Sequence, residues 1–401
     1  MQKIMILGAG IYQVPLIKKA SEMGLYTIVV SIPGDYPGFK YASKVYYENT
    51  TDTTAVLEIA KAEKIDGIVT TGTDVALATL GYVCDELGLK GVSKDSASKS
   101  CNKILMKQSL SSANVNTAKY VVASTSDSLN SIINKCDAIG YPLVIKAVDS
   151  SGSRGITVVK DSSMVETAVN SVKEISRTHN FLIEEFLDGE EYGADAFIID
   201  GQIQFIIPHG KYVYYAKTGI PVGHYAPYND QFVVDSTITE ASKAIKAMGY
   251  DNCAVNFDIM LHDNKPYIIE VGARCGATCI PELISLYCGY DYYEQMINAC
   301  LGNNCNATPI PSKFKASASK LLFSTKSGTL KAINGVNDIT ICKNACEGIY
   351  EVVVDKQPGD EIPAFEIGPH RIGHVIAYAD TLSRAEELLN DVVNKIEFEL
   401  E

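Results

Sequence analysis

Two acidic residues and an arginine lie on neighbouring segments whose spacing is typical of a metal site. The segment AVNFDIM contains Asp258, and the segment PYIIEVGAR contains Glu270 and Arg274. The intervening HDNK predicts a hairpin turn, which brings Asp258 close to opposite Glu270. Adjacent carboxylates repel each other unless a cation balances them, and Mg²⁺ binds through one or two carboxylates plus nucleotide phosphates. These residues alone also allow a solvated acidic face in which Arg274 is the ion-pair partner.

Gly272 lies between the acid and the base of the second segment. Successive residues of a strand point to opposite faces, so Glu270, Gly272 and Arg274 share one face. Asn256 shares a face with Asp258 in the same way. The pattern indicates a site in which the position beside Arg274 carries no side chain.

A glycine- and serine-rich loop follows Lys146 in the segment KAVDSSGSRGI. Backbone N–H groups of such a loop can cradle phosphate oxygens because no Cβ blocks the approach. A Walker loop ends in Gly-Lys-Ser/Thr and opens a helix, whereas this loop joins two predicted strands. The segment therefore indicates a phosphate-binding loop of another kind, and an exposed hairpin loop is the alternative.

The segment GAGIYQ near the N-terminus is almost a dinucleotide-binding fingerprint. Gln13 stands where the third glycine is expected, and the second predicted strand ends at Ser31 without an acidic residue to hold a ribose. A dehydrogenase is therefore a weak alternative. A tight turn between a strand and a helix explains the same residues, and a small substrate could still bind at that helix N-terminus.

The elements that must position these motifs divide the chain into three parts. Residues 1–95 alternate strands and helices, which predicts a doubly wound parallel sheet in an α/β chain. Residues 96–310 contain the motifs and read as an α+β domain that begins with one helix over residues 100–115. Residues 311–401 are strand-rich and end in a helix, which predicts a C-terminal α+β domain.

Composition excludes several classes of function. The chain has 401 residues, 46% hydrophobic content and a formal net charge of −13, so nucleic acid is not an expected partner. No apolar run reaches the roughly 18 residues that a membrane span requires. The eleven cysteines are odd in number and scattered. Together with an N-terminus that lacks a signal pattern, they predict a cytoplasmic protein with reduced thiols.

Five segments, taken in order, resemble the ATP-grasp superfamily. They are NKILMK, LVIKAVDSSGSRGI, LIEEFLDGEEY, NFDIML and IIEVGAR, which together span about residues 100–275. The resemblance implies a central ATP-grasp domain of two subdomains, with a lid subdomain over about 115–185. It extends to the flanking domains, and relatives of this type imply a homodimer.

The resemblance also implies a role for individual residues. Lys103 and Lys146 would contact phosphates, Lys146 and Arg274 would be catalytic, and Asp258 and Glu270 would hold Mg²⁺, with Mn²⁺ as the alternative. The lid loop would comprise Ser150, Ser151, Gly152, Ser153, Arg154 and Gly155. The adenosine would lie against Glu184, Glu185, Phe186, Leu187 and Glu191, with Glu191 rather than its neighbour Glu190 accepting the ribose hydroxyls.

Three further histidine and arginine positions are candidates for substrate contact. His209 and His224 lie in a segment dense in Tyr, Lys and His, which either lines an acceptor pocket or is an ordinary surface loop. Arg274 could hold a substrate carboxylate in a bidentate way, because its guanidinium is planar.

The implied reaction is ATP-dependent ligation of a small carboxylic acid, such as an amino acid, to an amine through an acyl-phosphate. Gly272 departs from the Glu-x-Asn-x-Arg pattern of many members and is similar to bacterial L-amino-acid ligases, as is the C-terminal segment 356–381. RCGATCIPELI does not match the signature of phosphoribosylglycinamide synthetases, which weakens a purine-pathway synthetase as the alternative. A non-catalytic ATP sensor is the second alternative.

Overall fold

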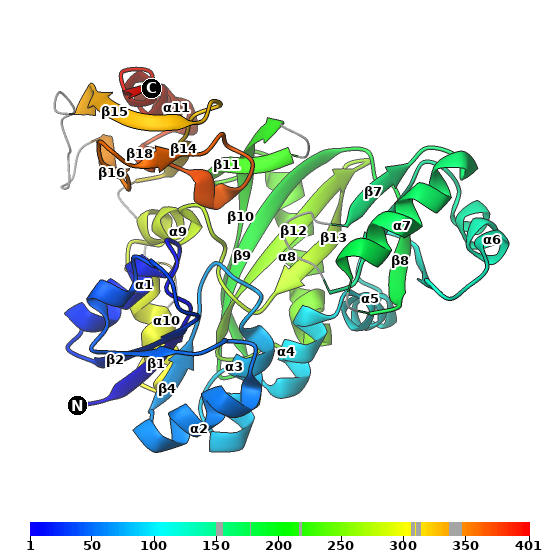
Figure 1. Ribbon diagram of the computed structural model, residues 1–401, viewed down its shortest axis with the longest axis horizontal. Helices are drawn as coiled ribbons and strands as arrows, with labels where there is room; N and C mark the ends of the chain where they lie inside the picture. Colours follow the sequence, from blue (N-terminus) through cyan, green and yellow to red (C-terminus); the bar gives the residue numbers. More distant parts are fainter. Residues whose placement is uncertain (150–154, 177, 216–218, 306–308, 310–313, 337–346) are drawn as a thin grey trace.

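The computed structural model describes residues 1–149, 155–176, 178–215, 219–305, 309, 314–336 and 347–401 (Figure 1). The N-terminal domain is a parallel sheet with strand order β3-β2-β1-β4. Its described elements are β1 (Lys3–Leu7), α1 (Val14–Glu22), β2 (Tyr26–Ser31), β3 (Lys44–Tyr47), α2 (Thr53–Glu63), β4 (Gly67–Val69) and α3 (Leu77–Leu87). Strands β1 and β2 are almost wholly buried, as apolar strands covered by helices on both faces must be. The predicted parallel α/β domain is confirmed.

Two short helices lead from this domain into the centre of the chain. They are α4 (Lys94–Cys101) and α5 (Lys103–Ser112). The prediction of one helix over residues 100–115 is wrong, because Asn102 adopts an extended conformation and caps a new helix. Its side chain accepts hydrogen bonds from the N–H groups of Ile104 at 2.9 Å and Leu105 at 3.2 Å.

A small antiparallel sheet with two helices forms a separate lobe (Figure 1). Its strand order is β5-β8-β6-β7, with α6 and α7 packed against the strands. The elements are β5 (Tyr120–Ser124), α6 (Leu129–Ile139), β6 (Leu143–Ala147), β7 (Ile156–Val159), α7 (Val165–Ile175) and β8 (Asn180–Glu185). This lobe lies in the segment predicted as the lid.

One large sheet connects the central and C-terminal parts of the chain. In the described residues its order is β13-β12-β9-β10-β11-β14-β18-β16. The strands are β9 (Glu190–Ile199), β10 (Gln202–Tyr215), β11 (Gly219–Ala226), β12 (Cys253–His262), β13 (Lys265–Gly272), β14 (Ala316–Leu322), β16 (Gly348–Val354) and β18 (Gly373–Ala379). The C-terminal strands thus extend the central sheet through the antiparallel pairing of β11 with β14.

Helices and a second small sheet complete the fold. They comprise α8 (Gln231–Met248), α9 (Ile280–Cys288), α10 (Tyr292–Cys300), β15 (Gly328–Asn334), β17 (Glu361–Ile362), α11 (Leu382–Val393) and β19 (Glu397–Leu400). Helix α8 packs on β10 and β13, and α10 contacts β4 of the N-terminal domain and β12 of the large sheet. The fold class is confirmed, while domain boundaries at residues 95 and 310 stay predictions.

No helix in the described parts of the chain has the length and apolar character needed to cross a membrane. The nine cysteines that the structure describes are all free thiols.

The aromatic cluster beneath α10 generates a stability prediction. Phe197 is fully buried, and its ring centroid lies 5.5 Å from that of Tyr292 and 6.1 Å from that of Phe205. We expect Phe197→Ala to lower the free energy of unfolding by about 3–5 kcal/mol, because it leaves a cavity between sheet and helix. Urea unfolding measures the change. Phe232→Ala removes a ring that is 65% exposed and should change stability by less than about 0.5 kcal/mol; equal losses would contradict the prediction.

Candidate active site

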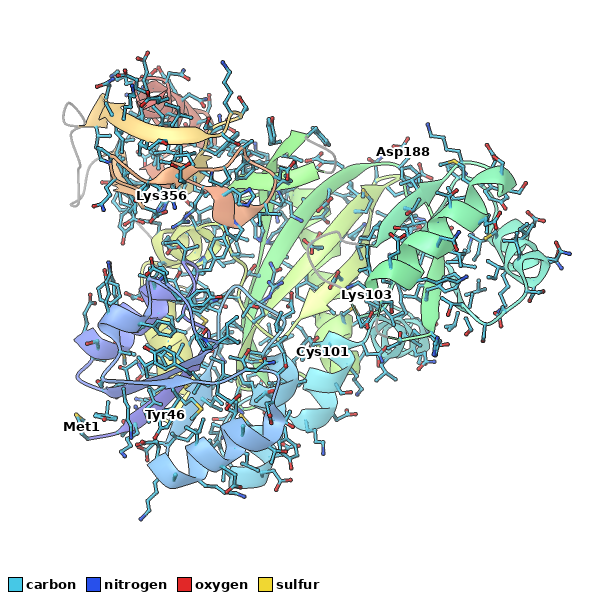
Figure 2. The ribbon with its side chains drawn as sticks, viewed as in Figure 1. Met1, Tyr46, Cys101, Lys103, Asp188 and Lys356 are labelled. Carbon is cyan, nitrogen blue, oxygen red and sulfur yellow. The ribbon has the colours of Figure 1, made fainter. Side chains whose placement is uncertain are left out.

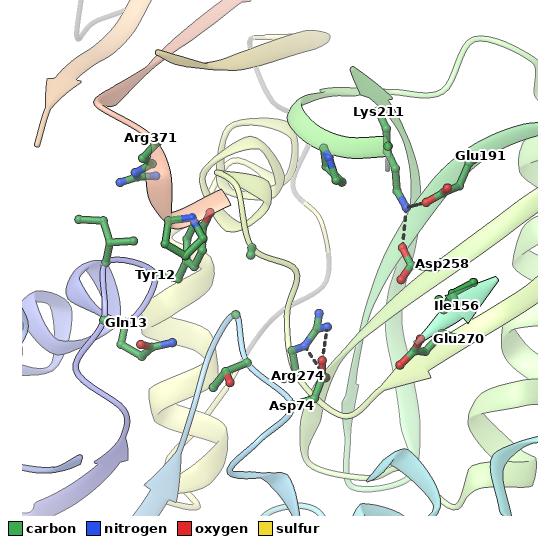
Figure 3. A pocket seen from close by; sticks show the side chains of 18 of the residues that line it. Tyr12, Gln13, Asp74, Ile156, Glu191, Lys211, Asp258, Glu270, Arg274 and Arg371 are labelled. Carbon is green, nitrogen blue, oxygen red and sulfur yellow. Dashed lines mark hydrogen bonds and ion pairs between the residues drawn. The ribbon is translucent and has the colours of Figure 1, made fainter. Parts of the chain in front are cut away.

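A cavity of about 1840 Å³ opens between the N-terminal domain, the small-sheet lobe and the large sheet (Figure 3). Nine of the predicted site residues line it: Lys146, Glu184, Glu185, Phe186, Leu187, Glu191, Asp258, Glu270 and Arg274. It also reaches Tyr12 and Asp74 of the N-terminal domain and Arg371 of the C-terminal part. Residues far apart in sequence therefore meet in one space that could hold a nucleotide and further substrates.

Asp258 and Glu270 stand directly opposite each other on β12 and β13, as the predicted hairpin requires. Each has a lysine as its counter-ion. Lys103 Nζ lies 3.0 Å from a carboxylate oxygen of Glu270, and Figure 2 shows Lys103 beside the large sheet at the start of α5. Lys211 Nζ, on β10, lies 2.5 Å from Asp258 and 2.8 Å from Glu191 (Figure 3).

The electrostatics of Lys211 and Asp258 follow from burial and pairing. Burial acts to raise the pKa of Asp258, but the adjacent ammonium group of Lys211 outweighs it and holds that pKa below its usual value. Burial acts to lower the pKa of Lys211, and the carboxylates of Asp258 and Glu191 raise it instead. The two groups therefore form an ion pair at neutral pH, in which Lys211 is buried and Asp258 is partly exposed.

The donor set suits a hard divalent cation. The carboxylates of Asp258 and Glu270 face one cavity and offer the oxygen ligands that Mg²⁺ prefers. Among the described residues, no group of three or more His, Cys, Asp or Glu side chains lies together as a complete ligand set. A metal held by this pair would keep water molecules or take phosphate oxygens, which is the usual behaviour of Mg²⁺.

A second buried charge cluster connects the small-sheet lobe to α5. Lys146 Nζ lies 2.8 Å and Lys107 Nζ 3.2 Å from the carboxylate of Glu184, and all three side chains are buried. Burial acts to raise the pKa of Glu184, but Lys146 and Lys107 together lower it. Burial lowers the pKa of Lys107 to about 8, against the opposing attraction of Glu184. Glu184 thus holds Lys146 at the cavity wall.

The segment after β8 presents backbone and apolar surface to the cavity. The carboxylate of Glu185 accepts a hydrogen bond from the N–H of Lys119 at 2.8 Å, so this side chain fixes the lobe rather than pointing freely into the cavity. Apolar side chains complete the walls around it: Val144, Ile156, Phe186, Leu187, Met260 and Ile269. Such walls suit a planar heterocycle such as adenine.

Glu190 and Glu191, at the start of β9, point to opposite faces of the sheet, as the alternation of a strand predicts. Glu191 lines the cavity and pairs with Lys211, whereas Glu190 lies close to Tyr228, whose pKa burial and this carboxylate raise above its usual value. Glu191 therefore faces the cavity, and its role toward a ribose stays a prediction.

The guanidinium of Arg274 forms hydrogen bonds with other side chains of the protein. Its Nε and Nη2 donate to the two carboxylate oxygens of Asp74 at 2.8 and 3.0 Å (Figure 3). Its Nη1 donates to Asn256 Oδ1 at 2.8 Å. The predicted bidentate clamp on a substrate carboxylate is therefore not the arrangement observed. A carboxylate of the N-terminal domain occupies that edge of the guanidinium.

His209 and His224 require a correction. Both are buried, with ring centroids 5.2 Å apart, and neither lines the cavity. His209 Nε2 lies 3.3 Å from Asp195, and burial lowers the pKa of His224 well below its usual value. They belong to the packing of β9, β10 and β11. His209 shares a strand face with Lys211 but is buried against Asp195 of β9, whereas Lys211 lines the cavity.

Several predicted residues fall elsewhere or outside the description. Lys103 does not line the cavity but forms an ion pair with Glu270. Gly155 does not line it either, and its carbonyl accepts a hydrogen bond from Ala147 N–H at 3.0 Å. Ser150, Ser151, Gly152, Ser153 and Arg154 lie outside the described residues.

Sequence reasoning missed Lys107, Lys211 and Asp74. Lys107 lies one helical turn after Lys103, a spacing that places both on one face. Lys211 lies two residues after His209 on β10, so the two share a strand face, and the candidate His209 was a usable signal to consider Lys211 as well. No sequence signal pointed to Asp74, because it lies 200 positions from its partner Arg274.

The geometry agrees with comparisons to known proteins. A family model described as an ATP-grasp domain matches residues 100–278, and one described as L-amino acid ligase C-terminal domain 2 matches residues 320–401. A solved structure of phosphoribosylglycinamide synthetase from Anaerococcus prevotii is 31% identical, covers 100% of both chains and superposes with a TM-score of 0.85. The chain belongs to the ATP-grasp family.

Other relatives of this ATP-grasp chain carry ligase names. Alanine–anticapsin ligase of Bacillus subtilis is 26% identical over 317 residues, which are 70% of this chain and 66% of that protein. An L-amino acid ligase from Bacillus licheniformis is 18% identical, covers 100% of this chain and 99% of its own, and shares the fold with a TM-score of 0.80. The family predicted from the five segments and the C-terminal domain is confirmed.

The Lys107–Glu184–Lys146 cluster generates a pH prediction. Folded Lys107 has a pKa of about 8 against 10.5 for an unperturbed lysine, so between these values the unfolded chain binds a proton that the folded chain has lost. Stability of the wild type relative to Lys107→Met should therefore rise by about 3 kcal/mol from pH 8 towards pH 10.5. Urea unfolding of both proteins at several pH values tests this, with Lys246→Met as the exposed-lysine control. A difference that stays flat or falls would contradict it.

Proposed function

We propose that this protein is an ATP- and Mg²⁺-dependent carboxylate–amine ligase. The reaction would transfer the terminal phosphoryl group of ATP to a small carboxylic acid, and an amine would then displace phosphate to form the C–N bond. The observation that carries the proposal is the carboxylate pair Asp258–Glu270, which faces one cavity together with Lys146 and the apolar wall after β8.

The residues of the chain would act mainly by positioning and by charge. Lys146, held by Glu184 at 2.8 Å, would bind phosphate oxygens, and the walls around Phe186 and Leu187 would hold the adenine. Asp258 and Glu270 would hold Mg²⁺, which when bound neutralises charge on the phosphoryl oxygens. No nucleophile on the protein is needed, because the substrate carboxylate attacks the phosphorus and the amine attacks the acyl carbon.

The far end of the cavity supports a small zwitterionic acid such as an amino acid. Arg371 and Asp355 form an ion pair of 2.8 Å there, and the Arg371 guanidinium lies 5.5 Å from the ring centroid of Tyr12. Both signs of charge thus lie at this end of the cavity, although the two groups are paired with each other. The match of residues 320–401 to an L-amino acid ligase domain supports the same substrate class.

A phosphoribosylglycinamide synthetase activity is the second candidate, favoured by the 31% identity to the Anaerococcus prevotii protein. The segment RCGATCIPELI after Glu270 argues against it, as does the amino-acid-ligase match at the C-terminus. Gly272, which departs from the Glu-x-Asn-x-Arg pattern, is the one sequence feature that favours the alternative of a non-catalytic ATP sensor. A cytoplasmic location and a homodimer stay predictions from the sequence.

A phosphate-release screen tests the proposal. Purified protein, ATP and Mg²⁺ are combined with amino acids and small carboxylates, with and without amines, and with glycine plus phosphoribosylamine as the second-candidate arm. Phosphate release that requires both an acid and an amine is the expected result. Nucleotide binding without turnover in any arm would favour the sensor.

Glu270→Gln should reduce this turnover by about 10²–10³-fold, because it removes a charge that Mg²⁺ and Lys103 both use. Glu166→Gln changes an exposed carboxylate on α7 and should leave turnover within about twofold of the wild type. Phosphate release measures both variants. Full activity in Glu270→Gln would exclude the metal assignment.

A further inference from the structure

Asp74 occupies the space that the missing side chain of Gly272 would need. A Cβ built on Gly272 would lie 2.9 Å from Asp74 Oδ1, which is closer than real Cβ contacts. Asp74 follows β4 of the N-terminal domain, whereas Gly272 ends β13 of the large sheet. Glycine at this position therefore allows a carboxylate from another domain to enter the site.

The same carboxylate saturates one edge of Arg274. Two parallel hydrogen bonds of 2.8 and 3.0 Å form the fork that a planar guanidinium and a carboxylate make together. On the other side, Asn256 Oδ1 accepts from Nη1 at 2.8 Å while its own amide donates to Asp195 at 2.8 Å. Asp195 in turn accepts from the N–H of Gly276 at 2.9 Å.

This network fixes the guanidinium from two domains. The Arg274 side chain is only 16% exposed and that of Asp74 28%, yet both line the cavity. Removing Asp74 would leave a largely buried charge without a carboxylate in the fork, held only through Nη1 by the neutral oxygens of Asn256 at 2.8 Å and the Cys275 carbonyl at 3.3 Å. The N-terminal domain thus controls the orientation of a cation at the edge of the metal and phosphate site.

We propose that Asp74 is a positioning residue for phosphoryl transfer, which acts through Arg274 and requires glycine at position 272. The proposal rests on the ligase function proposed above. Arg274 presents its remaining N–H to the cavity only while Asp74 holds it, so the reaction centre is complete only when the N-terminal domain is docked.

A stability comparison tests the contact without any use of activity. Gly272→Ala should increase the unfolding equilibrium constant about tenfold in the wild-type background and less than about threefold in Asp74→Ala, because the clash partner is gone. If Asp74→Ala does not fold, the background Asp74→Ala with Arg274→Met removes both charges and serves instead. Urea unfolding measures all variants. Equal effects of Gly272→Ala in both backgrounds would overturn the placement of Asp74.

A kinetic comparison tests the positioning role. Asp74→Asn keeps the shape of the side chain and should lower kcat for acid-dependent phosphate release at least about tenfold, while the Kd for ADP changes less than about twofold. In an Arg274→Lys background, which cannot form the fork, the same change should cost less than about twofold. Glu58→Gln, an exposed carboxylate of the same domain, is the matched control.

An unchanged kcat in Asp74→Asn would overturn the role of Asp74. An equal loss of kcat from Asp74→Asn in the wild-type and Arg274→Lys backgrounds would also overturn it, because it would indicate a purely structural effect. A wild-type protein that releases no phosphate with any acid overturns the ligase function and the catalytic role together. The stability comparison distinguishes that outcome, since it tests the Asp74–Gly272 contact independently.

Discussion

The balance of charge around Asp258 and Glu270 is the constraint on which the rest of the site depends. Two carboxylates that face each other across a strand pair repel. The fold meets the constraint with Lys211 from β10 and Lys103 from the start of α5. Because the two cations come from different elements, the long β9–β10 hairpin and the α4–α5 break at Asn102 both belong to the construction of the site. A nucleotide-bound metal would enter a place that already attracts cations.

The same rule of paired buried charge organises the nucleotide side of the cavity. Glu184 lies between Lys146 of β6 and Lys107 of α5, so its carboxylate joins the small-sheet lobe to the helix beneath it. An unpaired charge in this position would be costly, whereas the paired cluster is tolerated and holds Lys146 in a defined orientation. The cluster therefore fixes the lysine that we propose to contact phosphate.

Charged residues from the N-terminal domain and from the C-terminal part also contribute to the site. Arg274 receives a carboxylate from the N-terminal domain, and Arg371 brings a cation from the C-terminal part into the same cavity. The continuous sheet from β13 to β16 explains how the C-terminal residues reach this point, since β14 and β18 simply extend the strand order of the central domain. A ligase that must bring together a nucleotide, an acid and an amine gains from walls contributed by three parts of the chain.

The sequence by itself determined the local elements and their faces. Strand alternation and the HDNK turn placed Asp258 opposite Glu270, and the order of five segments identified the ATP-grasp family. Only the tertiary structure decided the partners: Lys211 for Asp258, Asp74 for Arg274, and a buried position for His209 and His224. The physical reason is that periodicity fixes the side to which a residue points, whereas an ion pair depends on which distant segment the packing of whole domains brings within about 3 Å. Gly272 shows the difference, because the sequence marks a missing side chain and the fold alone reveals the Asp74 carboxylate in its place.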